Sequence, residues 1–436
     1  MGIEVLTALF FGSLLLFLFL GTSLAWVLGG LSTIFLYFTW GSDAFYMVAA
    51  RMWSTMNSFT LLSIPLFVFM AVILERSGVA TSLYKMMHLW WGGVRGGLAI
   101  GTVVICAIFG AMVGVSGAAV VTMGAVALPA MLQRGYDKEM SLGCINAGGG
   151  FGVLIPPSIV MILYSMITGV SVGALFSAGI LPGLLLMTLV CLYIGIRCYL
   201  QPELAPAISK EQRATWKEKI LATKGVILPI FIVVIVLGSI LGGIATPTEA
   251  AAIGVLGALL SAALHRSLNW AMISEATSRT LRLTTMVMWV LFSAHAFTTA
   301  YNSMGAQSLV LDMMRLIPGG EWGALGAMLF IVFLLGMVLD PVGIMMITLP
   351  VFMPIMKSYG VDPIWFGILF IIMLEIGYMT PPFGFNLFYL KGVAPSSIEM
   401  SSIYRSVFPY VAVTMVGLLL IILFPSIALW LPSKIM

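Results

Sequence analysis

Two proline pairs within long apolar stretches are the feature of this sequence with the clearest chemical consequence: Pro156-Pro157 and Pro381-Pro382. Proline lacks an N–H, and its ring displaces the carbonyl four residues earlier, so each pair should interrupt a helix and free two carbonyl oxygens. The four oxygens predicted to be free belong to Gly152, Val153, Gly377 and Tyr378. Unpaired backbone groups do not survive against lipid, so both interruptions should be buried in protein or line a polar cavity.

Such interruptions have the chemistry of an ion-binding site. Backbone carbonyls are hard oxygen ligands suited to Na⁺, and the helix that restarts after each proline pair presents N–H groups to an anion. Ser158, Thr380 and Asn386 add neutral polar side chains beside the prolines. We therefore predict a site for sodium and an anionic solute here, with sodium held by backbone oxygens and no transition metal.

The composition places these stretches in a membrane. Of 436 residues, 61% are hydrophobic and 8% are charged, whereas about 25% are charged in soluble domains. Apolar runs of about 20 residues recur along the chain, which is typical of an all-α polytopic membrane protein without a separate soluble domain. The net charge of +4 is spread over loops and argues against a nucleic-acid partner.

Motifs for other chemistry are not found in the sequence. The four cysteines lack metal-ligand spacing, and no His-Glu-x-x-His, Gly-x-Ser-x-Gly or phosphate-loop motif occurs. An enzyme, an ATP-driven pump and a transition-metal centre are therefore not indicated.

The chain repeats itself at a constant offset of 225 residues, mostly in the glycines and prolines that control the backbone path. The matched pairs include Gly135 with Gly360, Asp137 with Asp362, Gly152 with Gly377, Pro156 with Pro381, and Tyr164 with Tyr389. We therefore divide the chain into a first repeat (residues 1–200), a basic cytoplasmic linker (201–224) and a second repeat (225–436).

Each repeat is predicted to contain a re-entrant hairpin followed by a broken helix. The first hairpin covers residues 97–132 with its tip near Ser116, and the second covers residues 322–356 with its interruption at Leu339-Asp-Pro-Val-Gly343. The interruptions leave arms that are too short for an easy crossing. The broken helices cover residues 139–168 and 363–391.

The number of crossings predicts how the repeats are oriented. About ten transmembrane crossings plus two hairpins place five crossings between equivalent points, and an odd number inverts one repeat relative to the other. Basic residues in the linker and in segments 76–95, 265–282 and 391–405 predict that these are cytoplasmic and that both termini are outside. The spans predicted in the second repeat include residues 225–243, 283–303 and 407–431.

Several motifs, in order along the chain, resemble the large membrane subunit of a TRAP transporter. They are Val113-Gly-Val-Ser-Gly117, Gly152-Val-Leu-Ile-Pro-Pro-Ser158, Ala245-Thr-Pro-Thr-Glu-Ala-Ala251 and Gly336-Met-Val-Leu-Asp-Pro-Val-Gly343. The resemblance implies a sodium-driven elevator carrier of organic acids, with scaffold and transport domains, in the cytoplasmic membrane of a bacterium or archaeon. It implies no cofactor beyond sodium as coupling ion. The implied partners are a small four-helix membrane subunit and an extracytoplasmic substrate-binding protein.

In that family the hairpin tips face the broken helices, which extends the predicted site to Gly114, Ser116, Gly117, Asp340, Pro341 and Gly343. Ser116 and Thr380 have the alternative role of helix caps, and Asp340 that of an N-cap. Glu249 suits a helix start better than a proton carrier. The sequence indicates no role for Glu375.

The sequence leaves the solute and two other functions open. Candidate solutes are C4-dicarboxylates, 2-oxo or hydroxy acids, sialic acid and small sulfonates. A stand-alone sodium-coupled carboxylate carrier would share the architecture. A channel is the remaining alternative, although channels do not require hairpins that enter from both faces. Tryptophans of the first half, such as Trp26 and Trp53, suit a membrane partner or lipid equally.

Overall fold

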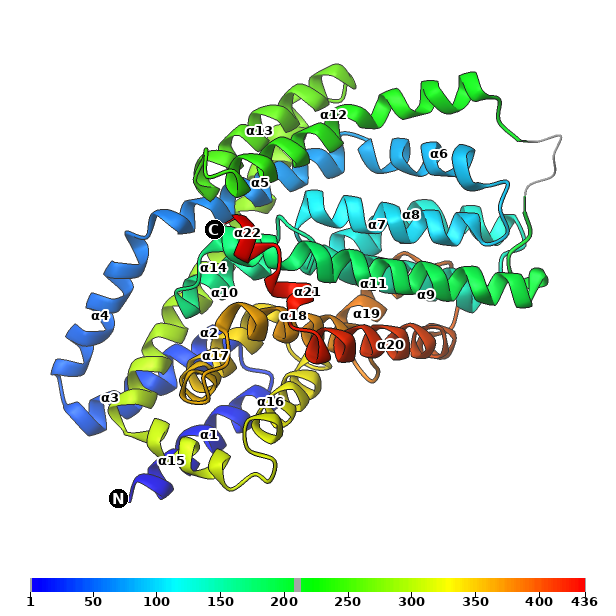
Figure 1. Cartoon of the computed structure of the whole chain (residues 1–436). Coiled ribbons are helices and arrows are strands. Elements are labelled where there is room, and N and C mark those ends of the chain that lie inside the picture. The colour runs from blue at the N-terminus through cyan, green and yellow to red at the C-terminus, as the bar shows by residue number, and fades with distance from the viewer. Residues whose placement is uncertain (1, 208–212, 436) are drawn as a thin grey trace.

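The computed structural model describes residues 2–207 and 213–435, which form helices and connecting loops with no strand among them (Figure 1). Eight helices in the described part are long and apolar enough to span a membrane, and six shorter apolar helices accompany them. The prediction of an all-α polytopic membrane protein is confirmed.

One group of helices, here called the peripheral helices, comes from the beginning of each predicted repeat. They are α1 (Ile3–Phe19), α2 (Leu24–Trp26), the π-helix η1 (Val27–Leu31), α3 (Ser32–Trp40), α4 (Asp43–Met56), the 3-10 helix η2 (Phe59–Leu62), α5 (Ser63–Arg76), α6 (Val79–Trp91), α12 (Trp216–Leu241), α13 (Pro247–Leu264), α14 (Trp270–Ser303) and α15 (Ala306–Arg315). Helix α5 packs between α13 and α14, and α6 packs against α12. Helix α4 runs along one edge of the molecule (Figure 1).

The other group, here called the central helices, contains the predicted hairpins and broken helices. They are α7 (Gly97–Val113), α8 (Ser116–Gln133), α9 (Lys138–Gly150), the 3-10 helix η3 (Phe151–Val153), α10 (Ile159–Thr168), α11 (Val172–Leu200), α16 (Gly320–Gly336), α17 (Pro341–Ser358), α18 (Pro363–Met379), α19 (Phe385–Val393) and α20 (Met400–Leu423). Helices α7 and α8 pack against each other, as do α16 and α17. Both Pro-Pro peptide bonds, in the α9–α10 and α18–α19 connections, are cis.

The core of the described protein lies along the first segment of each broken helix. Every residue from Met140 to Gly150 in α9 and from Trp365 to Met379 in α18 is buried. Helix α9 contacts α7, α8, α18, α19 and α20, so its glycines and small residues allow close approach from several sides. The first segments of the two broken helices therefore lie inside protein, whereas Phe383 after the second proline pair, and Phe388 and Tyr389 in α19, are about half exposed.

Some helix boundaries differ from the prediction. Helix α12 begins at Trp216, inside the stretch predicted as linker, because Thr215 and Glu218 form a capping box at its start. The described part of that stretch also contains the short 3-10 helix η4 (Pro202–Leu204). Residues 208–212 of the predicted linker, among them Lys210, lie outside the described residues.

Two further boundaries differ because of local capping and proline chemistry. Helix α14 starts at Trp270 rather than at residue 283, with Asn269 as its N-cap. The predicted last span to residue 431 is wrong, because α20 ends at Leu423 and Pro425 cannot supply the N–H needed to continue it. The short helices α21 (Ser426–Leu429) and α22 (Pro432–Ile435) follow. The role of Glu249 at a helix start is confirmed, since it forms a capping box with Thr246 in α13.

Candidate functional site

The first hairpin touches the first broken helix backbone to backbone. A Cβ placed on Gly110, one turn before the tip, would lie 2.5 Å from the Cα of Gly152. At the tip, the carbonyl of Gly114 accepts a hydrogen bond from the N–H of Ile159 (3.4 Å), the first residue of α10. The predicted tip and the predicted interruption are thus in direct contact.

The second hairpin makes the same contact with the second broken helix. A Cβ placed on Gly336, at the end of α16, would lie 3.0 Å from the Cα of Gly377. Gly152 and Gly377 are equivalent under the 225-residue offset, so both repeats use a glycine pair to seat a hairpin against an interruption. No other residue type permits this separation of backbones.

Residues from the two repeats meet at the ring of Tyr389 in α19. A Cβ on Gly117, in the first turn of α8, would lie 2.7 Å from Cε2 of that ring. Tyr389 was not among the predicted site residues, although its match with Tyr164 in the repeat was a signal that could have identified it.

Two of the four carbonyls predicted to be free are hydrogen-bonded. The Ser158 hydroxyl donates to the carbonyl of Val153 (2.6 Å), and the Thr380 N–H donates to the carbonyl of Gly377 (3.1 Å). The prediction is wrong at these positions because the chain turns sharply after each helix segment and brings a nearby donor onto the carbonyl. Each oxygen keeps a second lone pair.

At the second interruption, two carbonyl oxygens converge beside Gly384. The carbonyl oxygens of Tyr378 and Thr380 lie 2.6 and 2.9 Å from where a Cβ of Gly384 would be. Cδ1 of Leu387 lies 2.9 Å from the same point, so any other residue at position 384 would clash with these atoms. The pair of oxygens has the ligand chemistry that suits a hard cation.

Three side chains predicted as ligands or caps make local hydrogen bonds. Ser158 caps α10, and the Thr380 hydroxyl donates to the carbonyl of Ile376 (2.7 Å). Asp340 is the N-cap of α17, with Pro341 as its first residue, and accepts hydrogen bonds from the N–H groups of Val342 (3.2 Å) and Gly343 (3.3 Å).

The remaining predicted residues have different surroundings. The N-cap of α8 is Val115, so Ser116 is not a cap but the first residue of the helix. Gly343 packs against Leu24 of the peripheral helices. At the second proline pair, the carbonyl of Pro382 accepts a hydrogen bond from the hydroxyl of Tyr404 (2.6 Å). Pro156, Pro157 and Pro381 lie in the connections between the helix segments.

Three fully buried polar side chains lie on the broken helices without a hydrogen-bond partner among the described residues. Asn386 was predicted as a site residue, Glu375 had no predicted role, and Asn146 was not considered. Asn146 and Glu375 lie in the α9 and α18 segments that are buried throughout. A polar residue within such an apolar run was the available sequence signal.

A cavity of about 340 Å³ separates the first hairpin tip from α5 and α14. Its lining includes Val113, Val115 and Ile159 beside the tip, and Arg279 and Arg282 on α14. The remaining lining is largely apolar. The cavity therefore borders the predicted site and presents guanidinium groups to it.

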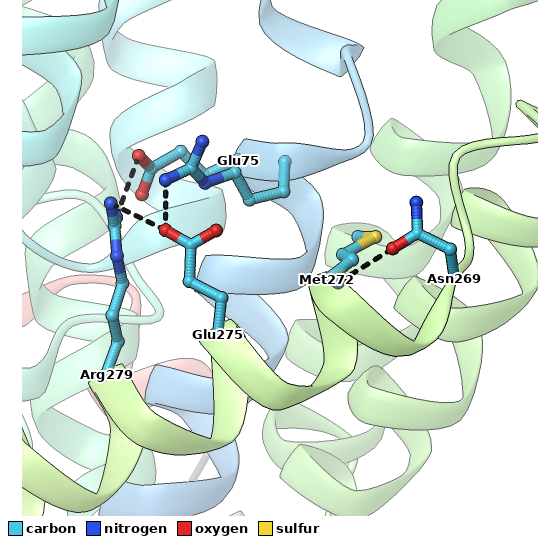
Figure 2. Close-up of polar contacts among 6 residues, drawn as sticks. Glu75, Asn269, Met272, Glu275 and Arg279 are labelled. Atoms are coloured by element: carbon cyan, nitrogen blue, oxygen red, sulfur yellow. Dashed lines mark hydrogen bonds and ion pairs between the residues drawn. The ribbon is translucent and has the colours of Figure 1, made fainter.

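The charges around this cavity are partly neutralised by ion pairs between α5 and α14. Figure 2 shows Arg279 between Glu75 (3.4 Å) and Glu275 (3.1 Å). Arg76 also pairs with Glu275. Two carboxylates thus balance two guanidinium groups, and Arg282 has no acidic partner among the described residues. One positive charge remains available to an anion.

Replacing Ser158 by alanine is expected to lower the thermal stability of the protein. The variant loses the hydrogen bond to the Val153 carbonyl and the cap on the N–H of Met161 inside a fully buried turn, a loss of about 1–3 kcal/mol. Thermal unfolding of the purified protein measures it. Ser171→Ala removes an exposed N-cap of α11 and should have a smaller effect; equal destabilisation would contradict the role given to Ser158.

The sequence of this chain is similar to those of known membrane transport proteins. Residues 11–427 match the family described as "Tripartite ATP-independent periplasmic transporter, DctM component". The chain is 34% identical to the C4-dicarboxylate TRAP transporter large permease protein DctM of Vibrio cholerae, over 93% of each chain. It is 34% identical to the ectoine TRAP transporter large permease protein TeaC of Halomonas elongata, over 85% of this chain and 86% of that one.

A third relative is longer than this chain. The isethionate TRAP transporter permease protein DctMQ of Oleidesulfovibrio alaskensis is 30% identical over 96% of this chain and 65% of its own length. Among solved structures, the Alcanivorax borkumensis YdaH transporter is similar in fold, with a TM-score of 0.66, 14% identity, and coverage of 97% of this chain and 98% of that chain. At this identity the likeness concerns the fold alone.

Proposed function

The chain belongs to the DctM component family of the tripartite ATP-independent periplasmic (TRAP) transporters, and from that premise we propose that it is a large permease subunit that couples uptake of a small organic anion to sodium. The observation that carries the proposal is the placement of both hairpins against interrupted helices, with the carbonyls of Tyr378 and Thr380 converging beside Gly384.

Sodium would be held by these residues at the second interruption. The carbonyls of Tyr378 and Thr380 converge beside Gly384 and offer hard oxygen ligands. A bound sodium ion would supply positive charge next to the anionic solute. Asp340, at the second hairpin tip, carries a carboxylate that favours a cation.

The solute is proposed to be a small organic acid with a carboxylate or sulfonate group. Relatives are named for C4-dicarboxylate, ectoine and isethionate. The cavity beside the first tip combines apolar lining with Arg282, which suits such a molecule. We propose that the central helices move as a unit along the peripheral helices, which is an elevator mechanism.

Two partners are proposed, a small four-helix membrane subunit and an extracytoplasmic substrate-binding protein. A cavity of about 1040 Å³ on the peripheral helices is lined by Trp26, Tyr37, Phe38, Phe45 and Trp289, among others. The exposed fraction of these five residues ranges from 49% to 81%. Such a surface suits contact with another membrane subunit.

Uptake into proteoliposomes tests the proposed function. With succinate, isethionate and ectoine as probes, uptake of at least one is expected only when an inward sodium gradient and both partners are present. It should also saturate, which separates a carrier from a channel. Equal uptake without the binding protein would favour a stand-alone sodium-coupled carrier. Equal uptake without sodium would reject the coupling.

The proposed topology places positions 217 and 391 in the cytoplasm and position 357 outside. Lys217 lies near the start of α12 and Lys391 near the end of α19, whereas Lys357 lies near the end of α17. Each lysine can be replaced by cysteine and labelled from outside in intact cells with a membrane-impermeant maleimide. Label is expected at position 357 only; labelling of 217 without 357 would show that the orientation is reversed.

A further inference from the structure

Buried polar atoms without partners gather on the two broken helices. Among the described residues, Asn146, Glu375 and Asn386 account for every buried carboxylate and amide atom without a partner, the other such atoms being hydroxyls, including that of Tyr378, and one imidazole nitrogen. An unpaired carboxylate is the most costly of these groups to bury. A fully buried glutamate in a membrane protein therefore calls for a counter-charge or a function.

Glu375 lies against Gly150 of the other broken helix. A Cβ on Gly150 would lie 2.7 Å from both Cγ and Oε1 of Glu375, so only glycine leaves room for this carboxylate. Gly150 and Glu375 are also equivalent under the 225-residue offset. Equivalent positions touch only where the axis that relates two copies passes between them. The carboxylate therefore lies on the line about which the two repeats are arranged.

Asn146 supplies a second buried polar group on α9. It precedes Gly150 by one helical turn, and side chains four residues apart on a helix start about 5–6 Å from each other. Asn146 is fully buried, and neither atom of its amide has a partner among the described residues. Asn146 thus lies one helical turn from Gly150, the residue against which Glu375 packs.

We propose that Glu375 and Asn146 form a buried binding site for a sodium ion, separate from the carbonyl pair at Gly384. The site rests on the proposed function, because it adds a position for the coupling ion. No lysine or arginine of the described residues pairs with Glu375, so the protein supplies no counter-charge. Three oxygens from two helices match the preference of a hard cation for carboxylate and carbonyl ligands.

A proton on Glu375 is the alternative to sodium. It would neutralise the carboxylate and supply one O–H donor, but it would place no cation between the two helices. A sodium ion can be coordinated by both carboxylate oxygens and the amide oxygen together. It would also join the two broken helices at the centre of the central helices.

Sodium binding to the purified permease tests this site without any transport assay. Thermal unfolding is recorded in sodium chloride and in choline chloride at equal ionic strength, and ²²Na⁺ binding is measured at equilibrium. Glu375→Gln is expected to bind at least one sodium ion fewer, and its sodium-induced rise in Tm should be at least about twofold smaller. Glu399→Gln, at an exposed glutamate, is the matched control and should respond like the wild type.

The outcomes separate this site from the proposed function. If the wild type binds sodium and Glu375→Gln binds the same amount, the site is rejected while sodium coupling stands. If the glutamine variant is merely more stable in both salts, Glu375 is protonated and the site is likewise rejected. If the wild type binds no sodium, the coupling itself fails. Asn146→Leu, which keeps the carboxylate, provides the same comparison should Glu375→Gln not fold.

Discussion

Replacing Gly336 by alanine is expected to lower uptake about tenfold or more, whereas Gly326→Ala in the same helix is expected to leave uptake unchanged. The new methyl group at position 336 would lie 3.0 Å from the Cα of Gly377, while at position 326 no atom lies within 4 Å. Both substitutions improve helix propensity similarly. The difference between them therefore reports the contact of the second hairpin with its broken helix.

The size of the effect follows from the nature of the clash. Backbone atoms cannot escape by changing rotamer, and overpacking of this kind costs about 1–3 kcal/mol. The population with the hairpin seated should fall about tenfold or more. Gly110→Ala, with its methyl group 2.5 Å from Gly152, should act in the same way in the first repeat. Wild-type uptake by both variants, at equal protein in the membrane, would show that the glycine contacts are not needed.

Replacing Pro156 and Pro157 together by alanine is expected to remove the sodium dependence of uptake while the permease still inserts. The change returns two N–H groups and removes both ring clashes, so helix can extend from η3 toward α10. In a buried membrane setting this is favourable, because each unsatisfied backbone group costs several kcal/mol. The carbonyls of Gly152 and Val153 would then accept helical hydrogen bonds and cease to line the interruption.

The hydrogen bond from Ser158 to the Val153 carbonyl refines this expectation. One of the two carbonyls at the first interruption is therefore already hydrogen-bonded. Closing the interruption should change the shape of the turn and the contact of Gly114 with Ile159, as well as the oxygen ligands. Uptake is measured against sodium concentration in proteoliposomes. Pro229→Ala, inside the continuous helix α12, is the control and should keep the wild-type sodium curve. A double variant with that same curve would refute the role of the first interruption.

Much of the fold was predictable because it depends on local chemistry. The apolar runs predict membrane helices, since lipid leaves backbone groups no partner except one another. Pro156 and Pro381 predict interruptions because proline has no N–H to donate within a helix. Thr246 with Glu249 predicts a helix start. The end of the last span was mispredicted because hydropathy continues past Phe424 while Pro425 ends the hydrogen bonding of the helix.

The candidate site was also predictable from the sequence only in part. By itself the sequence determined that the chain is a helical membrane protein with two similar halves and a proline-broken helix in each, because residue type and order suffice for these properties. Only the tertiary structure decided that Gly110 lies on Gly152, that Tyr389 lies on Gly117, and that Glu375 faces Gly150. These depend on which atoms come within about 3 Å of one another after packing, and no spacing along the chain specifies that.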